Sequence, residues 1–216
     1  MCPENPVGYS YLGWVYHHDY VLGNTTSPRE TLEKSMELAR KALSIDDSYD
    51  DPHSLLCMIY SLQGDYDKAI AEGKRGLALN PGSVGVLYNY ADSLIYAGRP
   101  EEAIPLFQKA IRLTPFGRSS LYRDYGHALR NVERYEEAVS AYKKAIHIAP
   151  DNVFAHVGLA STYSLMGRDS EARAEAAEVL RINPKFSLDY LEKIILFKDK
   201  SKKDQFFDAL RKAGLK

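Results

Sequence analysis

The hydrophobic residues of this chain recur three and four positions apart, in short stretches separated by turn residues. Between residues 51 and 81, one such stretch ends at Gly64 and a second ends at Asn80-Pro81. The spacing is typical of amphipathic helices. Glycine supplies the positive φ that ends a helix, and the residue before proline is pushed out of the helical region. The segment therefore predicts two helices joined by a tight turn. Its apolar positions are Leu55, Leu56, Ile59, Tyr60, Leu62, Tyr66, Ala69, Ile70, Leu77 and Leu79.

The same arrangement returns along the chain at a nearly fixed interval. Its closing prolines are 34, 35 and 34 residues apart, at Pro81, Pro115, Pro150 and Pro184. Twelve residues before them stand Ala69, Ala103, Ala138 and Ala172, and twenty-four residues before them stand Cys57, Ala91, Gly126 and Ala160. A fixed period of this length is the signature of a repeat array. Small residues at fixed positions let the two helices of a repeat approach closely.

These patterns predict an all-α superhelix of about five helix pairs followed by C-terminal capping helices. A divergent first repeat carries about ten extra residues, and its second helix starts at Pro28. After Pro184 the period is lost, and two helices are expected over 186–197 and 201–213. Terminal units of solenoids cover an otherwise exposed apolar end. The predicted domains are an array over 1–184, with repeats at about 6–47, 50–81, 84–115, 119–150 and 153–184, and a cap over 185–216.

The repeat positions resemble those of the tetratricopeptide repeat. In one repeat the resemblance rests on Leu56-Cys57, Tyr60, Gly64, Tyr66, Ala69 and Pro81, and their counterparts recur in the next three. The resemblance covers roughly residues 6–184 and implies a scaffold that binds other proteins. Some members grip the C-terminal carboxylate of a chaperone with lysines. Here the comparable sites hold Ser10, Ser54, Ser120 and Asp124, which disfavours that ligand.

The end of the chain has a narrower resemblance. Residues 183–187, 197–199 and 209–215, together with 97–103, look like bacterial tetratricopeptide modules C-terminal to class III adenylate/guanylate cyclase domains. The resemblance implies a regulatory or assembly module of a bacterial signalling protein, without the cyclase itself. Pro3 stands where the closing proline of an earlier repeat would stand, so we expect a fragment of a longer protein.

Composition narrows the chemistry. A formal net charge of −1 gives no general attraction to nucleic acid or anionic membrane. The two cysteines form no disulfide framework or metal motif, and the apolar stretches are too short for a membrane span. Adjacent His17 and His18 point about 100° apart on a helix, which disfavours a shared metal. We expect a cytoplasmic protein with no metal, no cofactor and no enzymatic activity.

The first helices of stacked pairs line a concave groove, where we expect a protein or peptide segment to bind. Aromatic and arginine side chains are the usual anchors of interfaces. In the last repeat the expected groove row is Val157, Ser161, Ser164 and Leu165. The candidate groove residues of the other repeats are Trp14, His17, Met58, Tyr88, Asp92, Tyr96, Arg123, His127, Arg130 and Asn131.

Three functions remain open from the sequence. The leading hypothesis is a non-enzymatic interaction scaffold whose partner is a protein segment, a domain fused upstream or a second copy of the chain. The alternative is a peptide or small-molecule sensor that relays occupancy to a fused effector such as a nucleotide cyclase. The least favoured is an enzyme with a site built from Trp14, His17, Arg123 and His127.

Overall fold

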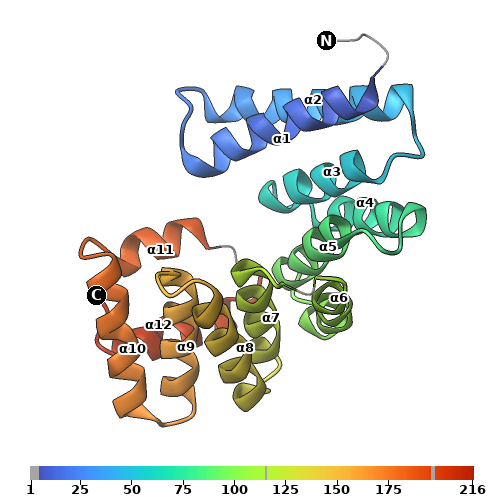
Figure 1. Cartoon of the computed structure of the whole chain (residues 1–216). Coiled ribbons are helices and arrows are strands. Elements are labelled where there is room, and N and C mark those ends of the chain that lie inside the picture. The colour runs from blue at the N-terminus through green and yellow to red at the C-terminus, as the bar shows by residue number, and fades with distance from the viewer. Residues whose placement is uncertain (1–4, 115, 196–197) are drawn as a thin grey trace. The chain divides into compact units, whose positions relative to one another are not determined.

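The computed structural model describes residues 5–114, 116–195 and 198–216. These residues form twelve α-helices and no strand (Figure 1). The predicted all-α class, with helices packed in adjacent pairs, is confirmed. Pro115, Phe197 and the first four residues, with Cys2 and Pro3, lie outside the described residues. The chain divides into two compact units, each defined by the contacts within it: residues 1–94 (unit 1) and residues 95–216 (unit 2).

Unit 1 contains two complete helix pairs and most of a fifth helix. Its helices are α1 (Pro6–Leu22), α2 (Pro28–Ile45), α3 (Asp50–Leu62), α4 (Tyr66–Leu79) and α5 (Val84–Tyr96), whose last two residues belong to unit 2. Neighbours α1 and α2 lie side by side, as do α3 and α4 (Figure 1). Small residues also let α4 and α5 pack closely together. A Cβ on Gly73 of α4 would lie 2.4 Å from the Tyr90 ring of α5, so only glycine fits there.

Unit 2 contains the remaining helices. They are α6 (Pro100–Leu113), α7 (Ser119–Asn131), α8 (Tyr135–Ile148), α9 (Val153–Leu165), α10 (Asp169–Ile182), α11 (Leu188–Ile194) and α12 (Lys200–Lys212). The pairs α7–α8 and α9–α10 stack through α8 and α9. Tyr142 of α8 is fully buried, and its ring fills the space left by Gly126 of α7 and Gly158 of α9.

The turns inside the repeats have one backbone conformation. Gly64, Gly98 and Gly167 have φ of 76°, 74° and 74°. Glu133 occupies the same place in the α7–α8 turn with φ 63°, and is the one non-glycine residue with positive φ in the described part of the chain. A side chain in this left-handed region costs free energy that glycine avoids.

The C-terminal helices differ from the predicted bounds. The helix expected over 186–197 begins at Leu188, because the Ser187 side chain accepts from the Tyr190 N–H, and ends at Ile194, where the chain becomes extended. The last helix begins at Lys200, one residue before the prediction. Asp199 caps it by accepting from the backbone N–H groups of Ser201 (2.8 Å) and Lys202 (3.2 Å).

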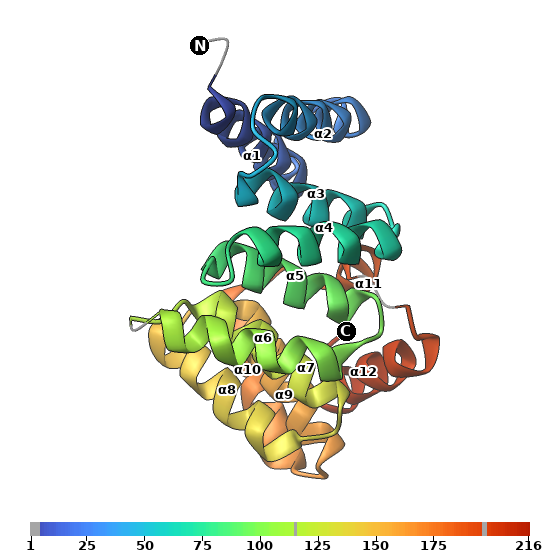
Figure 2. The same cartoon turned by 90° about the vertical axis from the view of Figure 1, so that its right-hand side faces the viewer.

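Helix α12 packs along α9 rather than only across the end of the last pair (Figure 2). Its Phe207 and Leu210 are almost fully buried. Two ion pairs tie it to earlier turns: Lys202 to Glu133 at 2.9 Å and Lys212 to Asp169 at 2.9 Å. The C-terminal segment is therefore an integral part of unit 2.

Candidate functional site

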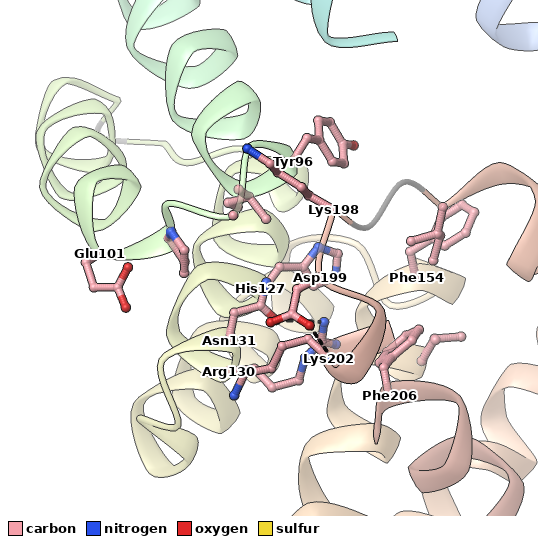
Figure 3. A pocket seen from close by; sticks show the side chains of 15 residues that line it. Tyr96, Glu101, His127, Arg130, Asn131, Phe154, Lys198, Asp199, Lys202 and Phe206 are labelled. Atoms are coloured by element: carbon pink, nitrogen blue, oxygen red, sulfur yellow. Dashed lines mark hydrogen bonds between the residues drawn. The ribbon is translucent and has the colours of Figure 1, made fainter. Parts of the chain in front are cut away.

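A cavity of about 250 Å³ lies within unit 2 (Figure 3). Its walls come from the end of α5 and the start of α6, from α7, from α9, and from Ile195, Lys198 and Asp199 together with α12. Segments from four successive parts of the chain therefore meet around one space. The labelled side chains in Figure 3 are Tyr96, Glu101, His127, Arg130, Asn131, Phe154, Lys198, Asp199, Lys202 and Phe206.

Arg130, in the last turn of α7, is the most buried charged side chain of the cavity wall, with 7% exposure. Its guanidinium donates to Ser161 Oγ at 3.2 Å and makes a long contact with Asn131 Oδ1 at 3.4 Å. The guanidinium carbon lies 4.4 Å from the centre of the Phe206 ring of α12. All three partners are neutral, and among the described residues Arg130 forms no ion pair.

His127 lies one turn before Arg130, with Nδ1 3.4 Å from Asp124 Oδ1 and its ring against Tyr142. Its side chain is 28% exposed, at the cavity wall, and is otherwise buried. This desolvation lowers the pKa of His127 to about 3, against the opposing effect of Asp124 and with a smaller lowering by Arg130 and Arg123. The imidazole is therefore neutral at pH 7 and offers one donor and one acceptor.

The wall formed by α12 was missed by the sequence analysis. Lys202 reaches Glu133 from it, Phe206 stacks on Arg130, and Phe154 of α9 adds an exposed ring. The apolar stripe Phe206-Phe207-Leu210 signals an amphipathic helix. It does not signal which helices that stripe will cover, because the repeat period has ended by then.

The structure corrects one predicted row of groove residues. Val157, Ser161 and Ser164 were expected to be exposed along the last repeat, but they are 2%, 0% and 6% exposed. Helices α7 and α12 both pack against α9, and Ser161 Oγ accepts from Arg130 of α7. The last repeat therefore does not present the exposed row that was expected.

The candidate groove residues fall into two groups. Tyr96, His127, Arg130 and Asn131 come together at the cavity of unit 2. Arg123 is in the same unit but does not line the cavity, since its guanidinium is bound to Asp124 by two bonds of 2.6 and 2.7 Å.

The other candidates belong to unit 1. Trp14 donates its indole N–H to Asp51 at 3.0 Å and packs edge-on against His17 at 5.3 Å. His17 is buried without a hydrogen-bond partner in the described chain, and burial, aided by His18, lowers its pKa to about 4. Among the remaining candidates, Met58 and Tyr88 are half-buried and Asp92 is buried.

The described residues contain no group of three His, Cys, Asp or Glu side chains that could hold a metal ion. The rings of His17 and His18 are 6.2 Å apart and inclined by 76°. Across residues 5–114, 116–195 and 198–216, no helix combines the length and apolar character needed to cross a membrane.

Two tetratricopeptide repeat family models match residues 83–151 and 132–191, which together span about half of the chain. The chain belongs to the tetratricopeptide repeat family. The match adds to the helix pairs and the 34-residue period, and it makes the chain a protein-interaction scaffold by class. The comparison with curated proteins gave no match.

Solved tetratricopeptide repeat structures share this fold. The type IV pilus biogenesis factor PilW is 19% identical with a TM-score of 0.74, covering 96% of this chain and 90% of its own. Pseudomonas aeruginosa PilF is 21% identical with a TM-score of 0.70, covering 97% and 88%. YrrB, described as having an unusual peptide-binding site, is 20% identical with a TM-score of 0.62, covering 89% and 93%. At these identities the likeness concerns the fold alone.

Proposed function

We propose that this tetratricopeptide repeat protein is a non-enzymatic scaffold that binds a protein segment at the cavity of unit 2. The observation that carries the proposal is the meeting of Tyr96, Arg130 and Phe206 around one concave space. Aromatic rings and arginine in a desolvated pocket are the usual energetic centre of protein interfaces. Asn131 and neutral His127 add hydrogen-bonding groups at the same wall.

The size of the cavity favours a side chain of a bound segment over a free metabolite. Small-molecule sites usually measure about 300–1,000 Å³ and enclose most of the ligand. The present cavity, at about 250 Å³, is below that range. It suits one or two side chains of a longer segment whose remainder lies outside. The peptide-binding site named for YrrB supports this mode of action in a related fold.

The scaffold is further proposed to serve a bacterial signalling protein of the cytoplasm. Support comes from the resemblance of residues 183–187 and 209–215 to the ends of cyclase-associated modules. On this proposal the bound segment belongs to a domain fused upstream or to a second copy of the chain. The sensor function stays as the second candidate, because a cavity with a buried arginine could also report on a small ligand.

The proposal is tested with peptides selected from a displayed random library on the intact chain. Affinities of the selected peptides are then measured by fluorescence anisotropy for Tyr96→Ala and Asn131→Ala. The control is Lys143→Ala, at an exposed position of α8. We expect each cavity variant to weaken binding by about 1–2 kcal/mol, as truncated interface anchors do. The control should bind like the parent, and all three should melt like it.

Unchanged affinity of both cavity variants, with a loss in Lys143→Ala, would place the binding surface on the outer helices. That result would refute the assignment of the cavity.

A further inference from the structure

Arg130 carries a buried positive charge that the described part of the chain does not balance with an ion pair. Its side chain is 7% exposed, and its partners are a hydroxyl, an amide oxygen and a phenyl ring. Buried charged side chains are almost always paired, because leaving water without a counter-charge is costly. Arg123, a part-buried arginine of the same helix, follows that rule by holding the Asp124 carboxylate at 2.6 Å.

The position of Arg130 shows where the missing counter-charge could come from. The guanidinium stands in the cavity wall, with Asn131 beside it and Phe206 stacked on it. Lys202, which also lines the cavity, is paired with Glu133. A planar guanidinium matches the two oxygens of a carboxylate.

Two acidic side chains, Asp199 and Glu101, also line the cavity and are possible counter-charges for Arg130. Asp199 uses its Oδ1 to accept from two backbone N–H groups at the start of α12, at 2.8 and 3.2 Å, so it acts as the helix cap. Glu101 is exposed in the first turn of α6. Neither forms an ion pair with Arg130 in the described structure.

Apart from Lys198, neutral His127 and Tyr96, the rest of the lining is apolar. Val157 and Ile95 lie in the same cavity as the rings of Phe154 and Phe206. A ligand that places a charged group at Arg130 would therefore lay an uncharged group against these side chains.

We propose that the Arg130 end of the cavity binds a carboxylate that is carried on an aromatic or aliphatic group. The inference rests on the proposed function and specifies it: the bound segment inserts an aspartate or glutamate beside an apolar residue. A free carboxylic acid has the same chemistry, so the experiment includes both sources.

The test uses the full chain and matched pairs of probes that differ only in charge. The free pair is 3-phenylpropionate and 3-phenylpropionamide. The peptide pair is N-acetyl-Phe-Glu-amide and N-acetyl-Phe-Gln-amide. Affinities are measured by NMR titration, with the shifted signals mapped onto the cavity. Hydrogen bonds to charged groups predict about tenfold or more tighter binding of each acid than of its neutral partner.

Arg130→Met keeps an unbranched side chain in the wall and removes the charge. We expect its ratio of acid to neutral affinity to fall to about one, because the charge that distinguishes the two probes has been removed. Arg130→Lys should retain part of the acid-to-neutral affinity ratio, because lysine keeps the charge but cannot make the bidentate contact of a guanidinium. Arg173→Met, at an exposed position of α10, is the control and should keep the parental ratio. Melting temperatures identify any variant that has lost its fold. If Arg130→Met has lost its fold, the acid-to-neutral affinity ratio of Arg130→Lys tests the role of Arg130 instead.

Equal affinity of acid and neutral probes in the parent chain overturns the carboxylate inference. If both still map to the cavity, the proposed function stands without it. Binding of the free acid but not of the peptide acid supports a carboxylate site and overturns its assignment to a protein segment. Acid preference that survives Arg130→Met overturns the role of Arg130.

Discussion

At the scale of single residues, local backbone and steric demands explain why particular side chains stand where they do. Glu133 adopts φ 63° in a turn where the other repeats use glycine, and its carboxylate holds Lys202 of α12 at 2.9 Å. Both side chains are partly exposed, at 61% and 33%. The backbone cost of a left-handed residue is about 1–2 kcal/mol, whereas an exposed ion pair contributes about 0–1 kcal/mol.

Glu133→Gly should therefore raise the free energy of unfolding by about 1 kcal/mol, because relief of backbone strain exceeds loss of the ion pair. Urea denaturation measures the change. Lys202→Met removes the same pair without changing the turn, and should shift stability by less than about 1 kcal/mol. A Glu133→Gly variant less stable than the parent would show that attachment of α12 outweighs the strain.

Gly158 gives a second prediction at this scale. A Cβ there would lie 2.4 Å from the ring of buried Tyr142, which Gly126 confines from the other side. Gly158→Ala should lower stability by about 1–3 kcal/mol through overpacking, despite the better helix propensity of alanine. The control is Gly85→Ala, because a Cβ added at Gly85 would meet no neighbouring side chain or packed backbone within 4 Å. This variant should be more stable than the parent. A stabilising Gly158→Ala would mean that Tyr142 can move aside.

At the scale of helices, a histidine–glutamate pair joins the two helices of a repeat. His156 of α9 donates from Nδ1 to Glu175 of α10 at 2.6 Å and from Nε2 to the Pro150 carbonyl at 2.9 Å. The hydrogen bond to Glu175, then that to Pro150, raises the pKa of His156 against the lowering effect of burial. The same pair recurs in unit 1 between His53 and Glu72, at 2.6 Å.

Because the pKa of His156 is raised in the folded state, its protonation stabilises the fold fully below the unfolded value of about 6.5 and less as pH rises through the folded value. Glu175→Gln should thus lower the free energy of unfolding more at pH 6 than at pH 9. Urea denaturation at both pH values measures the difference. An equal loss at both would mean that the pair stabilises without proton binding.

The sequence was most informative about helices and least informative about the site. The period of Ala69, Ala103, Ala138 and Ala172 determined the pairs, since each small residue has a steric reason that repeats. It also brought forward Tyr96, His127, Arg130 and Asn131, because first-helix positions face one side. The α12 wall was not predictable, because where Phe206 and Phe207 pack depends on non-periodic tertiary contacts. Asp199 falls between the two helices expected over 186–197 and 201–213, although a carboxylate there caps a helix well.

At the scale of the whole chain, unit 2 combines repeats and a C-terminal helix that completes their cavity. Phe206, Phe207, Leu210 and Leu215 are buried, each at 4% exposure or less. Each fully buried side chain of this size contributes about 1.5–3 kcal/mol. The C-terminal segment therefore adds to the stability of unit 2, which a solvated extension would not do.

Removal of residues 200–216 should lower the melting temperature of the chain and cause self-association, because Val157 and the neighbouring α9 side chains lose their cover. Calorimetry and size-exclusion chromatography measure both effects. A truncated chain that melts and elutes like the parent would contradict the structural role of α12. The matched control is removal of residues 1–4, which leaves the α1 cap Asn5 in place.

The central claim is that a protein segment binds at the cavity of unit 2, and site-specific photo-cross-linking tests it most directly. The photoreactive amino acid p-benzoylphenylalanine replaces Tyr96 in the cavity or, as a matched aromatic control, Phe116, which is 95% exposed in the α6–α7 turn. Each chain is irradiated with a library-selected peptide, and the adduct is located by mass spectrometry. We predict adducts from position 96 that excess unlabelled peptide abolishes, and few from position 116. Efficient cross-linking at 116 with none at 96 would contradict the claim.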